Sequence, residues 1–424
     1  DGLEFDLIEA RSGVRFLSRE RTTRKRIRTP DPCREEIIPA LGREIDEVLR
    51  KDPAADWVMV CPHGSRTLED FARERGRPAV SPPIGLYEWL YRKENFFSGL
   101  AKLGLPRLPG QWLSLKDARF SEFRKSLGLP FVLQESLAQS GAGTHIIRGE
   151  ADLNIVRSSL PDAPVWAVPY AGKLSLNINA MAMGNGVIAG YPSVQLVGLS
   201  MVGARPLFGY CGNDYTCTAK LPQEMVTMAQ DQAQRVGGWL SSLGFRGIFG
   251  LDFVADRDAG RLFAVDLNPR WQGSTSLESQ AMLRAGRIPL AAAELAYVTG
   301  SLDESEILRL RDDFMAPIVG SQIYLYYTGT DEVIIENAVR PGVYASEGGM
   351  KFRRAGLELS DCDAEDEILV CGGIMRPGTR LVKGARPARL VSLRAVLDSE
   401  TLEPLPWVRK AVADAYELFG LTPP

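Results

Sequence analysis

The stretch GIFGLDFVADRDAGRLFAVDLNPRWQGS, residues 247–274, carries the pattern that decides the fold. It reads as two apolar strands joined by a polar, glycine-containing turn, which predicts a β-hairpin. If the hairpin pivots near Ala259, Asp252 lies directly across the ladder from Asp266, because each is seven residues from the pivot. Opposed residues on antiparallel strands have Cβ atoms about 5 Å apart. Asn268, two residues beyond Asp266, points to the same face.

These side chains have the chemistry of a divalent metal site. Facing carboxylates repel each other, and acidic groups within apolar strands are costly unless paired or metal-bound. Asp252, Asp266 and the Asn268 amide form an all-oxygen ligand set, which suits Mg²⁺ or Mn²⁺. Arg270 follows, with a permanent charge and planar donors suited to phosphate, and a metal beside an arginine is typical of ATP phosphate binding. The alternative is a hairpin with polar residues on its solvent-exposed face.

Composition excludes several classes of protein. A chain of 424 residues, 45% hydrophobic and 24% charged, fits a globular protein of two or three domains. The net charge of −3 gives no reason to expect a nucleic-acid or membrane partner, and no apolar run reaches the length of about 20 residues that a membrane span needs. Six cysteines without CxxC pairs and only two histidines signal neither a disulfide framework nor a zinc cluster, so we expect a cytoplasmic protein. The acidic start is unlike a signal peptide, and it lacks an initiator Met, which leaves open whether residues precede Asp1.

An arginine-rich segment, residues 19–28, is the one local exception in charge. Two interpretations are open: a solvated loop or helix face, or an anion-binding arm for a substrate.

The pattern of apolar runs and turn residues predicts a mixed α/β (α+β) fold in three parts. Residues 1–85 read as a small α/β domain, residues 86–300 as the main domain, and residues 301–424 as a β-rich C-terminal domain closed by a helix. Expected helices are 67–75, 86–103, 223–242, 275–285, 290–298 and 407–418. Expected strands are 57–61, 78–80, 130–134, 144–148, 165–170, 175–182, 186–189, 322–327, 332–335, 342–344, 368–371 and 389–396.

A glycine-containing loop joins two of these strands: Ser140, Gly141, Gly143 and Thr144 lie in SGAGT. Glycines let backbone amides approach phosphate closely, although a flexible hairpin loop is the simpler interpretation. The loop is neither a P-loop, since GxxxxGK[ST] is absent, nor the GxGxxG fingerprint of dinucleotide binding.

Taken together, these features resemble the ATP-grasp family of carboxylate–amine ligases. Three pieces match in the family's order, over roughly residues 86–300. PFVLQESLAQSGAGTHIIRGEADL resembles the strand, glycine loop and strand that close over the ATP phosphates. VWAVPYAGKLSLNINAMAMGNGVIAGYPSVQLVG resembles the adenine hinge and the strands after it, and GFRGIFGLDFVADRDAGRLFAVDLNPRWQGS resembles the metal-binding strands.

The resemblance implies a role for each matching residue. Asp252, Asp266 and Asn268 would hold one or two magnesium ions against ATP, and Arg270 would neutralise the transferring phosphoryl group. Lys93 would reach the phosphates, although a helix-surface lysine is the alternative. The remaining implied contacts are the loop residues Ser140, Gly141, Gly143 and Thr144 for phosphate, Val168 and Tyr170 for adenine, and Gln195, Asn213, Asp214 and Ser274 for substrate. A structural role is an equal alternative for these last four.

Two positions depart from the family pattern. Gln134 stands where the family usually has a lysine, so one positive contact to ATP is missing or supplied elsewhere. Asp266 replaces a more common glutamate, which shortens the side chain by one methylene but preserves its ligand chemistry.

The resemblance implies an enzyme that uses ATP and Mg²⁺ (or Mn²⁺) to join a small-molecule carboxylate to an amine through an acyl phosphate. Amino acids or small peptides are the expected partners. A homodimer is among the expected assemblies. Three alternatives remain: an ATP-grasp carboxylase resembling biotin carboxylase, a non-catalytic nucleotide-binding protein, and a nicotinamide oxidoreductase using the N-terminal domain. No catalytic Ser/His/Asp or Cys/His arrangement is visible, which fits chemistry without an enzyme nucleophile.

Overall fold

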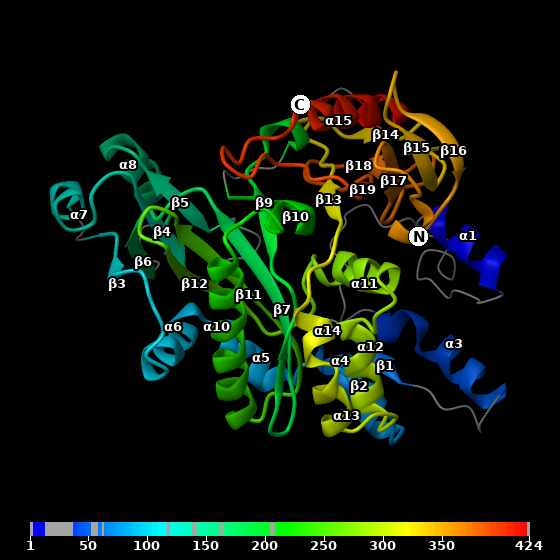
Figure 1. Ribbon diagram of the computed structural model, residues 1–424, viewed down its shortest axis with the longest axis horizontal. Helices are drawn as coiled ribbons and strands as arrows, with labels where there is room; N and C mark the ends of the chain where they lie inside the picture. The colour runs from blue at the N-terminus through cyan, green and yellow to red at the C-terminus, as the bar shows by residue number, and fades with distance from the viewer. Residues whose placement is uncertain are drawn as a thin grey trace.

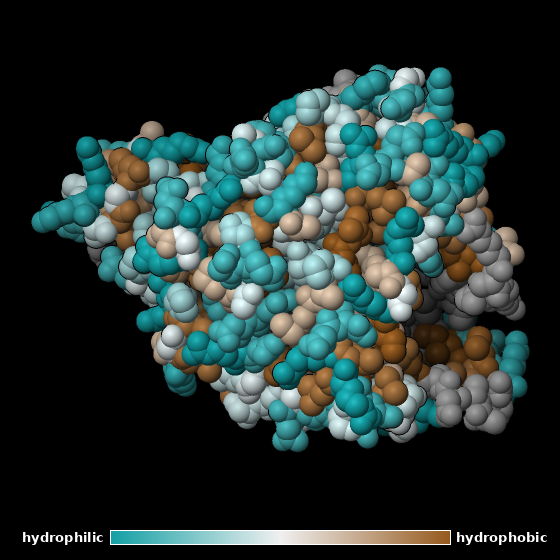
Figure 2. All heavy atoms as spheres, viewed as in Figure 1, coloured by the Kyte–Doolittle hydropathy of each residue, from teal (hydrophilic) through white to brown (hydrophobic). Residues whose placement is uncertain are grey.

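The computed structural model describes residues 3–12, 37–51, 58–61, 63–116, 119–137, 141, 143–160, 164–203 and 208–421. Within these ranges the chain forms two large β-sheets, two small ones, and helices packed on them (Figure 1). The arginine-rich segment 19–28 and Ser140 lie outside the described residues. None of the helices in the described ranges combines the length and hydrophobicity that a membrane span requires. On the face drawn in Figure 2, hydrophilic side chains predominate and hydrophobic ones form scattered groups.

An eleven-stranded sheet forms the centre of the molecule, in the order β12-β11-β7-β9-β10-β13-β19-β17-β15-β16, with β8 paired to β7. Its neighbouring strands are antiparallel. Strands β7 and β11 are apolar and largely buried, because the long helix α10 packs along them. The strands of the first half are β7 (Ser175–Ala182), β8 (Val187–Ala189), β9 (Ser193–Val197), β10 (Tyr210–Asp214), β11 (Gly247–Asp256) and β12 (Arg261–Asn268).

The central sheet continues into the C-terminal part of the chain. Strand β10 pairs with β13, so that Asn213 lies opposite Gln322, and β13 in turn pairs with β19. The strands that precede residue 301 and those that follow it are therefore joined into one sheet by backbone hydrogen bonds. The strands of the second half are β13 (Ser321–Tyr324), β15 (Gly342–Ala345), β16 (Lys351–Ala355), β17 (Glu367–Cys371) and β19 (Arg389–Ser392), beside the two-stranded pair β14 (Val333–Ile334) and β18 (Arg380–Leu381).

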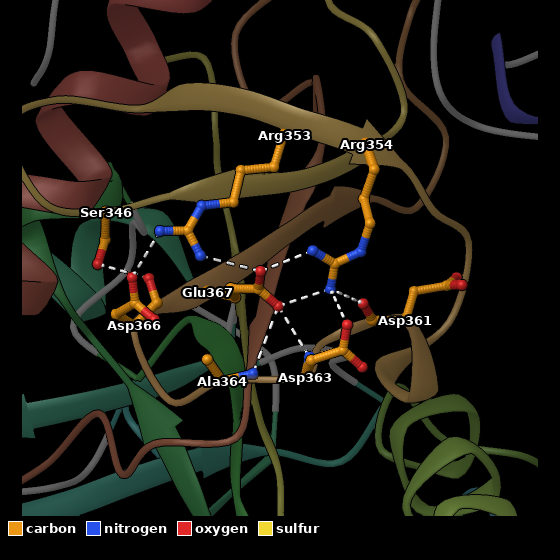
Figure 3. Close-up of polar contacts among 8 residues, drawn as sticks. All are labelled: Ser346, Arg353, Arg354, Asp361, Asp363, Ala364, Asp366 and Glu367. Carbon is orange, nitrogen blue, oxygen red and sulfur yellow. Dashed lines mark hydrogen bonds and ion pairs between the residues drawn. The ribbon is translucent and has the colours of Figure 1, made fainter.

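A buried carboxylate anchors the last strands of this sheet (Figure 3). Glu367, whose side chain is 3% exposed, accepts hydrogen bonds from Arg353 (3.0 Å) and from Arg354 (2.7 Å). The Arg354 hydrogen bond is the main reason that the pKa of Glu367 is lowered to about 2. This ion-pair cluster joins β16 to β17, which are both neighbours of β15.

A separate four-stranded sheet, in the order β3-β6-β4-β5, carries the expected glycine loop between β4 and β5. It has its own hydrophobic core, in which Phe123 and Phe131 pack with ring centroids 5.1 Å apart. Helices α7 and α8 lie with it in a lobe at one side of the molecule (Figure 1). The bounds are β3 (Gln111–Ser114), α7 (Phe120–Leu127), β4 (Phe131–Glu135), β5 (Thr144–Ile147), α8 (Glu150–Ser159) and β6 (Pro164–Pro169).

The N-terminal part contains the expected small α/β unit. Strands β1 and β2 are parallel, with α4 between them in the chain, and an ion pair between Arg75 and Asp46 (3.0 Å) joins α4 to α3. A second ion pair, between Asp6 and Arg376 (2.7 Å), joins α1 to the C-terminal part. The bounds are α1 (Leu3–Ser12), α3 (Ile37–Lys51), β1 (Met59–Val60), α4 (Arg66–Glu74) and β2 (Ala79–Val80).

The single helix expected over residues 86–103 is wrong, because the structure has two. Helix α5 ends at Leu90 and α6 begins at Lys93, with Arg92 in an extended conformation between them. No glycine or proline marks this break in the sequence. The remaining helices are α9 (Tyr215–Thr218), α10 (Gln223–Ser242), α11 (Thr275–Arg284), α12 (Leu290–Val298), α13 (Glu304–Arg309), α14 (Arg311–Met315) and α15 (Pro406–Leu418), after α5 (Ile84–Leu90) and α6 (Lys93–Lys102).

Candidate functional site

The hairpin of β11 and β12 brings the two predicted acidic residues face to face. Asp252 pairs with Asp266, as predicted, and Asn268 pairs with Gly250 one step along the same face. The register shifts between Asp252 and Phe253, where Val265 is an extra residue on β12. Nearer the turn, the paired residues are symmetric about the point between Asp258 and Ala259. If this register continued without the bulge, Asp252 would lie opposite Val265. The β-bulge therefore creates the carboxylate pair.

Amide side chains surround the Asp252 carboxylate. Asn177 Nδ2 donates to Asp252 Oδ1 (2.6 Å), Asn268 Nδ2 donates to Asp252 Oδ2 (3.3 Å), and Gln272 Nε2 lies 3.4 Å from Oδ1. Burial first, and the facing Asp266 carboxylate second, raise the pKa of Asp252. A carboxylate that faces a second carboxylate at this distance is in a place where a cation would be stabilised.

A lysine already supplies one positive charge to this pair. Lys93 Nζ lies 2.5 Å from Asp266 Oδ1, and Lys93 is only 7% exposed although it begins helix α6. Lys93 is therefore not a helix-surface residue.

These residues fit a divalent cation, although they are a small ligand set. In the described part of the chain no group of three or more His, Cys, Asp or Glu side chains is arranged so that it could hold a metal ion. The candidate set has two carboxylates and one amide, Asp252, Asp266 and Asn268, which is a hard oxygen set that leaves room for phosphate oxygens. The Lys93 ammonium shows that a cation is accommodated at Asp266.

Arg270 extends the site from the end of β12. Its guanidinium donates to Asn268 Oδ1 (3.0 Å) and to the Trp271 carbonyl (2.9 Å). In the described residues it has no carboxylate partner, so its charge remains available for an anionic ligand.

A buried chain of polar side chains, which sequence reasoning missed, lies behind Asp252. Ser274 donates to Asn177 Oδ1 (2.6 Å), and Asn179 Nδ2 donates to Glu278 Oε2 (2.9 Å). Asn179 also donates to Ser274 (3.1 Å), so the chain is continuous from Asp252 to Glu278. Asn177 and Asn179 are the signal that could have revealed it, because two amides alternate on one face of an otherwise apolar strand.

A cavity of about 890 Å³ opens beside the hairpin. It lies between the two large sheets and is bordered by the 270–276 segment and by residues near 386 and 402. The predicted site residues that line it are Lys93, Gln134, Gly141, Gly143, Thr144, Val168, Tyr170, Gln195, Asp252, Asp266, Asn268, Arg270 and Ser274. A volume of this size accommodates a nucleotide or a ligand of similar size.

The loop after β4 reaches the cavity through the residues described there. Gly141 has φ +78°, and a Cβ at this position would lie 2.1 Å from the Phe208 carbonyl oxygen, so only glycine allows this approach. Gln134 pairs with Thr144 across the β4–β5 ladder, which places both beside the cavity. Arg148, just after β5, also lines it, but it follows the end of the ladder where Ile147 pairs with Phe131, away from Gln134.

The expected adenine hinge lies at the end of β6. Val168 lines the cavity with a buried side chain, in register with Val132. The Tyr170 amide donates to the Pro130 carbonyl (3.4 Å), so this donor is already used in the structure.

Two of the predicted substrate residues are not brought to the cavity. Asp214 is fully buried and accepts from the amides of Cys217 (2.7 Å) and Val396 (2.7 Å), so it holds the start of α9 and a loop of the C-terminal part. Asn213 is fully buried and donates to Ser193 (2.9 Å). The other two, Gln195 and Ser274, line the cavity.

Solved structures with the same fold are ATP-grasp enzymes. The biotin carboxylase domain of 2-oxoglutarate carboxylase from Hydrogenobacter thermophilus, a dimer in complex with MgADP, ADP and bicarbonate, is 16% identical, with a TM-score of 0.55 over 84% of this chain and 74% of that chain. L-amino acid ligase from Bacillus licheniformis is 15% identical, with a TM-score of 0.51 over 86% and 81%. N5-carboxyaminoimidazole ribonucleotide synthetase from Thermotoga maritima is 12% identical, with a TM-score of 0.50 over 88% and 82%. No family model matches the sequence, and no curated protein sequence is significantly similar to it.

The chain therefore has the ATP-grasp fold, which confirms the fold class expected from the sequence. At these identities the likeness concerns the fold, and it extends to carboxylases as well as to an amino acid ligase.

Proposed function

We propose that this protein is an ATP-dependent ligase that forms an amide bond, of the peptide type, between a carboxylate and an amine, releasing ADP and phosphate. The observation that carries the proposal is the Asp252–Asp266 pair, with Asn268 and Arg270 beside it, on the wall of a nucleotide-sized cavity. The fold is compatible with this chemistry.

The proposed reaction begins with transfer of the ATP γ-phosphate to the substrate carboxylate. Asp252, Asp266 and the Asn268 amide oxygen would hold the divalent cation, which supplies neutralisation of phosphate charge when bound. Arg270 would pair with the phosphoryl oxygens, since its guanidinium faces the site without a carboxylate partner in the described residues.

The chain's other residues would position the reactants. Asn177 and Gln272 orient Asp252 through hydrogen bonds, and the polar chain behind them fixes these amides in place. Lys93 would exchange Asp266 for an ATP phosphate once another cation neutralises that carboxylate. Attack of the amine on the acyl phosphate then forms the amide and releases phosphate.

Two other functions make different predictions. A bicarbonate-dependent carboxylase would cleave ATP with bicarbonate and biotin and would need no amine. A nucleotide-binding protein without activity would bind ATP stoichiometrically and release no phosphate with any acid and amine.

The experiment is a phosphate-release assay with MgATP over pooled carboxylic acids and amines, with mass spectrometry of the products. We expect phosphate release that requires both an acid and an amine, and a product heavier than either. Release that needs bicarbonate alone, or ATP binding without release in every pool, would refute the proposal.

A matched pair of variants tests the metal ligands in the same assay. Asp266→Ala should reduce turnover by at least a hundredfold, because it removes one of the two carboxylates. Asp258→Ala is the control, since Asp258 is an exposed acidic residue in the turn of the same hairpin and does not line the cavity. Full turnover in Asp266→Ala would show that the assignment of this carboxylate is wrong.

A further inference from the structure

A short hairpin of the C-terminal part, which we call the strap, lies along the wall of the cavity. It spans residues 397–404, just before α15, and an antiparallel bridge between Leu397 and Pro404 closes its base. Leu397, Leu402, Glu403 and Pro404 all line the cavity. The position of the strap therefore sets part of the border of the space in which a ligand would lie.

Hydrogen bonds hold the strap together and fix its base. The Asp398 carboxylate accepts from the amides of Glu400 (3.1 Å) and Thr401 (2.8 Å) in the tip. At the base, the buried Asp214 carboxylate accepts from the Leu397 amide (3.2 Å). Because the tip is tied to itself and the base is anchored, a movement of the strap would be a rotation of the whole hairpin about its base.

Exposed contacts join the strap to the β11–β12 hairpin and to the segment that follows β6. Arg257, an exposed residue in the turn of the hairpin, donates to the carbonyls of Ser399 (3.1 Å) and Glu400 (2.9 Å). Lys173, between β6 and β7, forms an ion pair with Glu403 (3.5 Å), and both of these residues line the cavity. Their side chains are 69% and 59% exposed. Exposed ion pairs contribute little to stability, so these contacts can break and re-form while the rest of the protein stays folded.

Leu402 has a strained backbone at the wall of the cavity. Its φ is +58°, and in the described part of the chain it is the non-glycine residue with a positive φ. This conformation is costly for leucine, because its Cβ crowds the backbone, and glycine would adopt it without that cost. The Leu402 side chain packs partly on the core and borders the cavity. Strain of this kind is typical of segments that act on a ligand, which favours a functional role for the strap.

We propose that the strap is a gate that opens for the nucleotide to enter and leave the cavity, and that Arg257 is the latch that holds it shut. The inference rests on the proposed function for its nucleotide and adds the step that limits nucleotide exchange. Arg257 is not among the described residues that line the cavity, so it holds the strap equally firmly with and without a nucleotide. Loss of the latch should therefore speed entry and release by the same factor and leave the affinity unchanged. Loss of a residue that binds the nucleotide would instead weaken the affinity, mainly through faster release.

The test measures the exchange of the fluorescent nucleotide mant-ADP, in MgCl₂, on the full chain by stopped-flow fluorescence. The association rate constant comes from a concentration series, and the dissociation rate constant comes from a chase with excess unlabelled ADP. Arg257→Ala should raise both rate constants at least fivefold, the change expected for the loss of about 1 kcal/mol of hydrogen bonding. The dissociation constant should stay within twofold of that of the unmodified protein, which also shows that the variant is folded.

Arg261→Ala is the matched control, because Arg261 is an exposed arginine at the other end of the same turn and pairs with Asp256 (3.2 Å) rather than with the strap. It should exchange mant-ADP at the rates of the unmodified protein. Unchanged rates in Arg257→Ala, or faster release with weaker binding and unchanged association, would each overturn the gate and leave the proposed ligase function standing. Failure of the proposed function has a different signature, because an unmodified protein that binds no mant-ADP would refute the nucleotide site and the gate together.

Discussion

Replacing Gly250 with alanine places a methyl group where the Gln272 side chain now lies. A Cβ on Gly250 would be 1.8 Å from Gln272 Cδ and Oε1 and 2.3 Å from Nε2. The backbone of Gly250 is not in the left-handed region, so the cost comes from this contact alone. Gln272 must move, and it then gives up its hydrogen bond with Asn177 (2.7 Å) and its contact with Asp252 (3.4 Å).

The magnitude follows from these contacts. A net loss of about 1 kcal/mol for a neutral hydrogen bond, and a similar loss for the weaker one to a carboxylate, predict a destabilisation of about 2 kcal/mol. Turnover should also fall, because Asp252 and Asn177 lose one of the groups that orient them.

Urea denaturation of a double-mutant cycle measures this cost. Gly250→Ala should destabilise the protein in the Gln272 background and should cost much less in the Gln272→Ala background, where the clash is absent. Gly238→Ala is the matched control, because Gly238 is exposed on helix α10 and an added Cβ meets nothing within 4 Å. That variant should be stabilised by up to about 1 kcal/mol. Equal costs of Gly250→Ala in both backgrounds would refute the packing argument.

Three further predictions concern charged residues. Lys93→Met should lower the midpoint of thermal unfolding in EDTA, because Asp266 loses its only ion-pair partner in the described residues. MgCl₂ should then raise this midpoint more for the variant than for the unmodified protein, and an equal rise in both would contradict the metal assignment. Glu367→Gln should destabilise the protein by about 3 kcal/mol at pH 7, since the native pKa near 2 lies below the unfolded value of about 4.3. The difference should vanish as the pH falls from about 4.5 to 2, and a constant difference over this range would disprove the reasoning. Burial raises the pKa of Glu278 to about 8, so the folded state holds a proton that the unfolded state releases. The stability of the unmodified protein relative to Glu278→Gln should therefore fall by about 4 kcal/mol between pH 4.5 and 8 in urea titrations, whereas parallel curves would refute this.

The sequence contained enough information for the fold class and for the pair at the centre of the site. Asp252 and Asp266 were predicted to face each other from distance to the turn, and they do, although through a bulge that no residue pattern announces. Helices 223–242 and 290–298 have the predicted bounds, because a proline precedes each of them, Pro222 and Pro289, and a glycine follows shortly after each, Gly244 and Gly300.

The parts that could not be predicted depend on contacts between distant segments. The break before Lys93 has no glycine or proline to announce it, and the partner of Lys93, Asp266, lies 173 residues later in the chain. Gln272 was missed because its hydrogen-bond partner Asn177 comes from a different strand, β7. Asn213 and Asp214 are polar residues at the end of a strand, and this sequence pattern is the same whether such residues bind a ligand or have a structural role.

The pairing of β10 with β13 has a consequence for how the protein could be taken apart or recombined. A fragment ending near residue 300 would expose the backbone of β10 as an open edge, which is prone to association with other strands. Exchanging the C-terminal segment for that of another enzyme would have to reproduce this ladder, and not only the residues that line the cavity. Evolution of a new substrate preference is therefore expected to proceed by substitutions within this segment more readily than by its wholesale replacement.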